Sequence, residues 1–266
     1  MRRTAFAFAL ALVALNASAT KLEETFDRTY DVRPGAAVTL TNVNGHIVIR
    51  AWDQPRVRVH AVKHVEVDGS DKAKEALAAL KIEVSSTDGG LKVFTRYPKR
   101  NDNGLGFLDW MFGEHVNASV TYELMVPRTM NLDLDNTNGG IEVSDVRGSH
   151  RIDTTNGRIE LQRCAGDLDA ETTNGAIRAE LLEMTPGKSV RLETTNGRIS
   201  LAAPTTLAAN VDAATTNGSI NTDLPIATTR SGRHSLRGAI NGGGPELWLR
   251  TTNGSIEIRA ASAVTR

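Results

Sequence analysis

The chain of 266 residues carries 31 basic and 31 acidic side chains, so its formal net charge is zero. Because the chain also lacks a basic block, this balance argues against a nucleic-acid partner. Cys164 is the single cysteine, which excludes an internal disulfide, and we expect it to be a buried, unreactive thiol.

Residues 1–19 have the pattern of a secretory signal peptide. Two arginines precede an apolar run from Ala5 to Leu15, and Ala17-Ser18-Ala19 has the small residues of a cleavage site. The run is too short to span a bilayer. We therefore expect export to the periplasm, or alternatively secretion or display at the cell surface. The mature chain would begin near Thr20 with 29 basic and 31 acidic residues, a net charge of −2.

Residues 20–128 are predicted to form a β-rich N-terminal part. Alternation of apolar and polar residues indicates its strands: Leu22–Val32, Ala37–Leu40, His46–Arg50, Pro55–Val67, Ile82–Ser85, Leu91–Tyr97 and Val116–Val126. One helix is predicted over Asp71–Leu80, with Ser70 as its N-cap. Four apolar residues share one side of it at helical spacing: Ala73, Ala76, Leu77 and Leu80.

A long connection between two of these strands, Pro98 to His115, carries six large apolar side chains within the eight positions from Leu105 to Phe112. Leaving its large side chains in water forgoes about 1.5–3 kcal/mol for each, so something should cover them. The cover is either the protein's own helix or solenoid end, or else a partner, a second copy or a membrane surface. The segment is therefore a candidate interaction loop, whose residues are Leu105, Phe107, Leu108, Trp110, Met111 and Phe112.

From about residue 129 to residue 266 the chain is expected to be a repeat solenoid with a polar C-terminal tail. Thr-Thr-Asn-Gly, or a close copy, recurs with an Ile two residues after each Gly. A fixed period of about 20 residues is typical of stacked units, which bury a continuous core only together. Asn-Gly alone could instead mark antiparallel hairpins, but repetition of the whole motif favours the solenoid. The expected corner residues are Asn138, Asn156, Asn174, Asn196, Asn217 and Asn253.

Stacking predicts ladders of equivalent residues about 4.8 Å apart. We expect the corner Asn to point inward and to hydrogen-bond the backbone of the next rung. The Gly after it should supply a left-handed corner. The interval from Asn217 to Asn253 is about two repeats long, so we expect a drifted corner within it, at Arg237-Gly238-Ala239-Ile240.

Several of these features together resemble one family. They are the Trp52-Asp53 turn before a Val-rich strand, the helix at Asp71–Leu80, the Arg96-Tyr97-Pro98 exit, the Thr-Thr-Asn-Gly-x-Ile rungs and the closing stretch Gly242 to Arg250. The chain is similar to the bacterial domain-of-unknown-function family 4097, which carries the label "putative adhesin". The resemblance implies an exported β-solenoid of the envelope, with no established activity, cofactor or catalytic residue to carry over.

Four acidic residues that precede corners form one outward column by alternation: Asp135, Asp153, Glu171 and Glu193. Parallel β-helices that cleave polysaccharides use such carboxylates as acid and base or to hold a cation. A solvated charged face is the commoner reason for such a column. His60 and His64 share one strand face about 13 Å apart, too far for one metal ion. We therefore expect no catalytic residue, metal or cofactor.

These observations favour an all-β solenoid with a β-rich N-terminal part carrying one short helix. The function that they favour is an exported, non-enzymatic scaffold or binding protein of the bacterial envelope. Its partner would be an envelope protein, a glycan or a second copy, with peripheral membrane contact possible through the aromatic loop. The alternative is a carbohydrate-active parallel β-helix enzyme that uses the acidic column.

Overall fold

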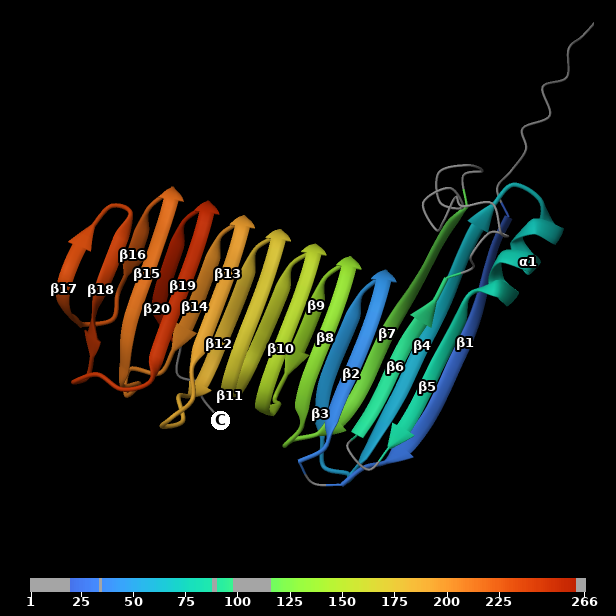
Figure 1. Cartoon of the computed structure of the whole chain (residues 1–266), viewed down its shortest axis with the longest axis horizontal. Helices are drawn as coiled ribbons and strands as arrows, with labels where there is room; N and C mark the ends of the chain where they lie inside the picture. The colour runs from blue at the N-terminus through green and yellow to red at the C-terminus, as the bar shows by residue number, and fades with distance from the viewer. Residues whose placement is uncertain (1–19, 34, 88–89, 98–115, 262–266) are drawn as a thin grey trace, which may run out of the picture.

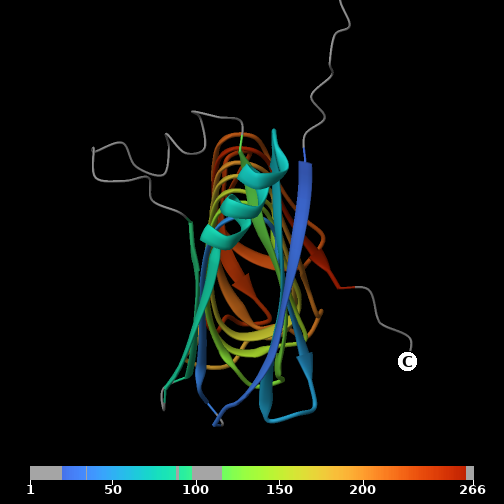
Figure 2. The ribbon, with the colours of Figure 1, turned by 90° about the vertical axis from the view of Figure 1, so that its right-hand side faces the viewer.

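The computed structural model describes residues 20–33, 35–87, 90–97 and 116–261. They form a long, flattened β-solenoid, in which two layers of strands face each other across an apolar core (Figures 1 and 2). Neighbouring rungs pair in parallel and in register, so that Thr154 lies beside Thr172 and Asn156 beside Asn174. The solenoid predicted from the repeats is therefore confirmed, and the hairpin alternative is wrong for the rungs.

The first layer contains the strands that lead into the Asn-Gly corners. In spatial order it consists of β5 (Lys81–Thr87), β6 (Gly90–Arg96), β2 (Ala37–Asn44), β8 (Asn131–Asn138), β10 (Arg147–Asn156), the second half of β11 (Ile159–Asn174), β13 (Val190–Asn196), β19 (Glu246–Asn253), β15 (Ala209–Asn217), β18 (Ser235–Ile240) and β17 (Ile226–Gly232).

The second layer contains the strands that leave the corners. In spatial order it consists of β1 (Thr20–Asp31), β4 (Arg56–Val67), β7 (Asn117–Pro127), β3 (Ile47–Trp52), β9 (Ile141–Ser144), the first half of β11, β12 (Ile177–Glu183), β14 (Ile199–Ala203), β20 (Ile256–Ala260) and β16 (Ile220–Thr222).

One rung shows why the sequence folds in this way. Ile152 and Thr154 point inward from β10, and Ile159 and Leu161 point inward after the corner, each no more than 6% exposed. The residues between them face solvent, as the alternation predicts. Cys164 is fully buried where β11 crosses from one layer to the other, and burial raises the pKa of its thiol to about 12.

The helix α1 (Ser70–Ala79) lies at the N-terminal end of the stack, against β4 and β1 (Figure 2). Ala73, Ala76 and Leu80 are buried, as the helical spacing predicts. The predicted cap is wrong, however, because Gly69 occupies the N-cap position and no side chain caps the helix. The chain reaches Ser70 through the positive φ of Gly69, which already places Ser70 inside the helix.

The order of the last rungs departs from the order of the chain. β19 pairs with β13 on one side and with β15 on the other, so the final repeat is inserted between two repeats that precede it. The drifted corner predicted at Arg237-Gly238-Ala239-Ile240 is also wrong. These residues belong to β18, which runs antiparallel to β15 and forms a hairpin with β17 at the end of the first layer.

Candidate binding surface

The corner of each rung places one Thr inside and the next Thr outside. The inner hydroxyl donates to the carbonyl of the corner Gly on the neighbouring rung, at 2.8–3.1 Å from Thr154, Thr172, Thr194, Thr251 and Thr215. Asn136 makes the equivalent bond to Gly45 at 2.8 Å through its amide. The inner Thr, and not the Asn of the motif, is therefore the group that joins each corner to the backbone of the next.

The Asn residues of the corners form a ladder along the outer edge of the stack. Six hydrogen bonds of 2.8–2.9 Å join the side chains in the order Asn44, Asn138, Asn156, Asn174, Asn196, Asn253 and Asn217. In each of them the side-chain amide donates to the side-chain carbonyl of the preceding Asn in this order. The expectation of an inward Asn bonded to backbone is wrong. The Asn side chains lie at the surface, where they bond one another.

We expect Asn174→Ala to lower the free energy of unfolding by only about 1 kcal/mol. The substitution removes two side-chain hydrogen bonds, to Asn156 and from Asn196, but water can satisfy the exposed amides that remain. Thermal unfolding measures this directly, with Arg178→Ala as a surface control. A loss above 3 kcal/mol would contradict the exposed ladder.

Thr172→Val should cost more, about 1–3 kcal/mol, although it preserves the shape of the side chain. Thr172 is 1% exposed, and the variant leaves the Gly157 carbonyl without the hydroxyl that reaches it at 3.0 Å. The matched control is Thr173→Val one residue later, on the exposed outer column. If the two variants unfold at the same temperature, the inner hydroxyl ladder does not stabilise the stack.

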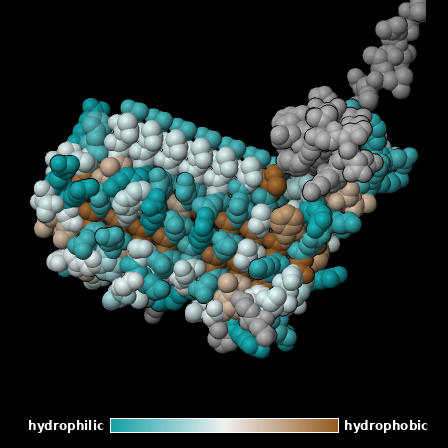
Figure 3. Space-filling view, viewed as in Figure 1, coloured by the Kyte–Doolittle hydropathy of each residue, from teal (hydrophilic) through white to brown (hydrophobic). Residues whose placement is uncertain are grey.

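The outer Thr residues make a second column beside the Asn ladder. Thr155, Thr173, Thr195, Thr252 and Thr216 are all exposed. The two columns follow the upper edge of the molecule as continuous rows of intermediate and hydrophilic colour (Figure 3). The corner edge therefore presents hydroxyl and amide groups at a constant spacing. The alternation of the sequence is sufficient to identify these Thr residues as outward-facing. Their order along the edge could not be read from the sequence, because the rung of Thr252 is inserted between those of Thr195 and Thr216.

The predicted acidic column lies on the outer face of the first layer. Asp135, Asp153, Glu171 and Glu193 stand on successive rungs in register. Arg250 and Ala214 continue the row on the last two parallel rungs.

Arginines of the adjacent column pair with two of these carboxylates. Arg151 contacts Asp153 at 2.9 Å, and Arg191 contacts Glu193 at 2.6 Å. Partial burial, reinforced by neighbouring carboxylates, raises the pKa values of Asp135, Asp169 and Glu171. The face thus alternates paired carboxylates with carboxylates that are harder to ionise.

An aromatic side chain interrupts this charged face between Arg191 and Asp212. The Trp248 ring lies 3.9 Å from the Arg191 guanidinium and 4.5 Å from that of Arg250. Arg250 in turn donates to Asp212 at 2.8 Å. Both arginines stack on the ring through cation–π contacts. Trp248 therefore joins the inserted rung to β13 through Arg191, and Arg250 joins it to β15 through Asp212.

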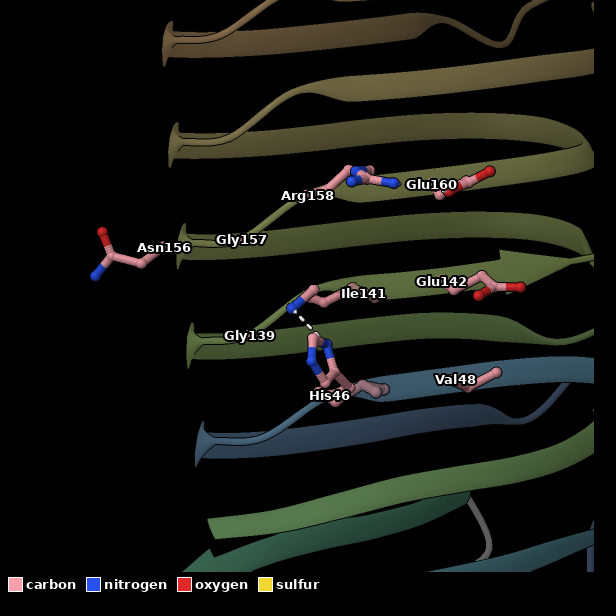
Figure 4. A pocket seen from close by; sticks show the side chains of 11 residues that line it. His46, Val48, Gly139, Ile141, Glu142, Asn156, Gly157, Arg158 and Glu160 are labelled. Atoms are coloured by element: carbon pink, nitrogen blue, oxygen red, sulfur yellow. Dashed lines mark hydrogen bonds and ion pairs between the residues drawn. The ribbon is translucent and has the colours of Figure 1, made fainter. Parts of the chain in front are cut away.

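A shallow hollow of about 460 Å³ lies on the outer face of the second layer, just beyond the corners (Figure 4). His46, Arg158 and Glu160 line it, and the Gly140 N–H donates to His46 Nδ1 at 3.1 Å. The hollow forms because Gly140 carries no side chain between His46 and Arg158. It mixes one cation with carboxylates and is large enough for a small polar group.

The remaining predicted groups are placed as follows. His60 and His64 face carboxylates of β1, with His60 Nδ1 at 3.4 Å from Asp27 and His64 Nδ1 at 3.0 Å from Glu23. Within the part of the chain that the structure describes, no three His, Cys, Asp or Glu side chains converge as a metal site requires. The candidate interaction loop lies outside the described residues.

No protein of curated function matches this chain. A structure from Clostridium sporogenes ATCC 15579, described as a "putative cell adhesion protein", shares 9% identity, with 90% of this chain and 100% of that chain covered and a TM-score of 0.50. A "putative adhesin" from Bacteroides fragilis NCTC 9343 shares 12% identity over 90% of this chain and 97% of that chain, with a TM-score of 0.30.

A third structure, a "putative lipid binding protein" from Parabacteroides distasonis ATCC 8503, shares 14% identity over 93% of this chain and 98% of that chain, with a TM-score of 0.26. At such identities only the first likeness bears on this chain, and it concerns the fold alone. The family model described as Toastrack DUF4097 matches residues 118–259, which is more than half of the chain. The chain therefore belongs to the Toastrack DUF4097 family.

Proposed function

We propose that this chain is an exported, non-enzymatic, adhesin-like binding protein of the bacterial envelope. The observation that carries the proposal is the corner edge, where exposed Thr and Asn columns repeat in register along the rungs. A repeating row of hydroxyl and amide groups suits an extended partner with repeating polar groups, such as a glycan chain. The solenoid keeps this row in a fixed geometry, so little conformational entropy is lost on binding.

Two further observations support this role and this location. The Clostridium sporogenes structure is described as a "putative cell adhesion protein", which suggests a role in adhesion. The two arginines and the apolar run at the start of this sequence suggest export. None of the helices in the described part of the chain is long and apolar enough to cross a membrane.

Sedimentation with purified peptidoglycan and with insoluble envelope polysaccharides tests the proposal. Wild-type protein should sediment with at least one of them, and Thr173→Lys combined with Thr195→Lys should abolish this binding without lowering the unfolding temperature. Ser200→Lys, on the outer face of the second layer, is the matched control and should still bind. If the Thr variant binds as wild type does, the corner edge is not the binding surface.

A carbohydrate-active enzyme is the second candidate, and the acidic column favours it. Asp153, which Arg151 contacts, lies between Asp135 and Glu171, whose pKa values are raised. An acid beside a carboxylate is the arrangement that glycosidases use. We nevertheless infer binding without cleavage, because the same raised pKa recurs along the face at Asp169 and marks no single pair.

Product analysis after incubation with the same polysaccharides separates the two candidates. We expect no new reducing ends. Cleavage that is lost in Asp153→Asn or Glu171→Gln would replace the binding proposal by the enzyme.

The aromatic segment remains a proposed second contact on its composition alone. Replacing Phe107, Trp110 and Phe112 by Ser should abolish association with a partner or with liposomes while the unfolding temperature is unchanged. A lower unfolding temperature with unchanged association would show that these side chains belong to the protein's own core.

A further inference from the structure

The strand β1 forms one edge of the second layer. All twelve of its residues pair antiparallel with β4, from Thr20 beside Val67 to Asp31 beside Arg56. No other strand in the described ranges pairs with β1, which lies at the end of the stack (Figure 1). The N–H and C=O groups on its outer side therefore have no strand partner there. An unpaired edge of this length is a template for another strand unless something opposes the pairing.

The inner face of β1 is only partly covered. Leu22, Phe26 and Tyr30 pack against the end of the core but stay partly exposed. On the facing layer, Ile82 and Val84 of the edge strand β5 also pack against the core and also stay partly exposed. The core is thus only partly covered at this end, where α1 packs against β4 and β1 but the inner side chains of the two edge strands keep part of their exposure.

We propose that this edge binds a second copy of the chain, with the two β1 strands antiparallel and Phe26 opposite Phe26 on a two-fold axis. An isologous contact of this kind closes after two copies. It continues the second layer from one copy into the other, and it brings the partly exposed side chains Leu22 and Tyr30 together on the inner face.

Backbone geometry restricts the possible registers. A residue directs its N–H and C=O to the same side of its strand, and successive residues alternate between sides. Two copies of one edge can therefore pair only residues whose numbers are both even or both odd, which places the two-fold axis on a residue and never between two. Among the registers that remain, the charges of the facing side chains determine which one is favourable.

The register centred on Phe26 is complementary. It places Glu24 opposite Arg28 and Lys21 opposite Asp31, each twice by symmetry. Opposite charges on facing positions stabilise a pair of strands, and like charges destabilise it. In this register no two like charges face each other.

The neighbouring registers are not complementary. Centring on Thr25 would place Glu23 opposite Asp27 twice. Centring on Asp27 would place Asp27 opposite itself and Glu23 opposite Asp31. Centring on Glu24 or on Arg28 would set that residue against its own copy. Of these five registers, only the one centred on Phe26 sets no like charges opposite each other, and an axis on Leu22 or Tyr30 would pair only one end of β1.

The contacts within one copy are compatible with the pairing. Glu24 accepts a hydrogen bond from the buried Lys63 at 2.7 Å, and its second carboxylate oxygen can meet Arg28 of the other copy. Arg28 lies over the Phe26 ring, 5.2 Å from its centre, on the inner side of the strand.

The opposite role for these charges predicts a different result. If the inward charges of Glu24 and Arg28 serve to prevent strand pairing, the protein is a monomer.

Light scattering on purified mature protein tests the proposal with charge variants. Wild type should be a dimer at micromolar concentration. Arg28→Glu and Glu24→Lys should each weaken the dimer by about tenfold or more, because each sets like charges opposite each other at two positions. An equimolar mixture of the two variants should form a heterodimer, in which both facing pairs are again of opposite charge.

A cysteine cross-link tests the register independently. Phe26→Cys should form a disulfide between copies under mild oxidation, because the two positions face each other across the axis. Thr29→Cys is the matched control, since its copies would lie about 20 Å apart along the strands. Cys164 is fully buried and should not interfere. A monomeric wild type, a dimer unaffected by Arg28→Glu, or equal cross-linking at both positions would each overturn the proposal.

Discussion

Replacing Gly175 by alanine should lower the free energy of unfolding by about 3–5 kcal/mol, although only one methyl group is added. A Cβ atom at Gly175 would lie 1.8 Å from the Gly157 carbonyl oxygen and 2.5 Å from its carbon. Both atoms belong to the backbone of the next rung, so no side chain can move aside. The rungs would have to separate at the corner and break the parallel pairing on both layers.

Chemical denaturation of Gly175→Ala measures this loss. Gly232→Ala in the end hairpin is the matched control, because its nearest neighbours would lie 3.9 Å from the new Cβ. The control should change the free energy of unfolding by less than about 0.5 kcal/mol. If both variants have the same denaturant midpoint as wild type, the backbones of neighbouring corners do not approach each other as closely as these distances indicate.

Acidification from about pH 6.5 to about pH 4 should destabilise the protein through His150, by about 3 kcal/mol at the lower limit. This residue is 2% exposed, between the two layers, and its Nε2 lies 3.4 Å from the Val146 carbonyl oxygen. Burial lowers the pKa of His150 from 6.5 to about 4. The unfolded chain therefore takes up a proton before the folded chain does, and stability falls as the pH falls through this interval.

The His150→Leu variant isolates the effect. Raised pKa values at Asp135, Asp169 and Glu171 act in the opposite direction, because the folded state then binds protons more readily than the unfolded state. These carboxylates are present in both proteins, so the difference between wild type and variant reports His150. Equal pH dependence of unfolding in the two proteins would show that His150 is not buried as a neutral ring.

The architecture could be predicted from the repeats because each repeat shows, within a few residues, which side chains face inward and where the chain turns. Alternation around Ile152 and Thr154 is sufficient to assign inner and outer faces, and the constant period is sufficient to predict stacking. The same reasoning placed Asp135, Asp153, Glu171 and Glu193 in one outward column. The outer Thr column follows from the same alternation, so the candidate surface is largely readable from the sequence once the stack is accepted.

The reason for the corner glycine was not predictable from the motif alone. Asn-Gly suggests a left-handed turn, yet Gly157, Gly175 and Gly197 do not have φ angles in that region. Glycine is needed there because each corner carbonyl occupies the place of a Cβ on the next rung. That distance between rungs exists only in the folded stack, so no local pattern reveals it.

The order of the last rungs was not predictable for a different reason. Thr-Thr-Asn-Gly-Ser-Ile occurs identically at residues 215–220 and 251–256, so the corner residues cannot determine which copy lies next to the rung of Thr194. Long-range contacts distinguish the two copies, among them Trp248 against Arg191 and Arg250 against Asp212.

The insertion of β19 and β20 also constrains the order in which the molecule can be completed during synthesis. The rungs of β8, β10 and β11 can pair one after another as the chain is synthesised, because each neighbouring strand follows directly in the sequence. β13 and β15 acquire their shared neighbour only when residues 246–253 have emerged. A chain interrupted before Glu246 would hold two unsatisfied strand edges, which makes such nascent fragments the form most exposed to aggregation and to proteolysis.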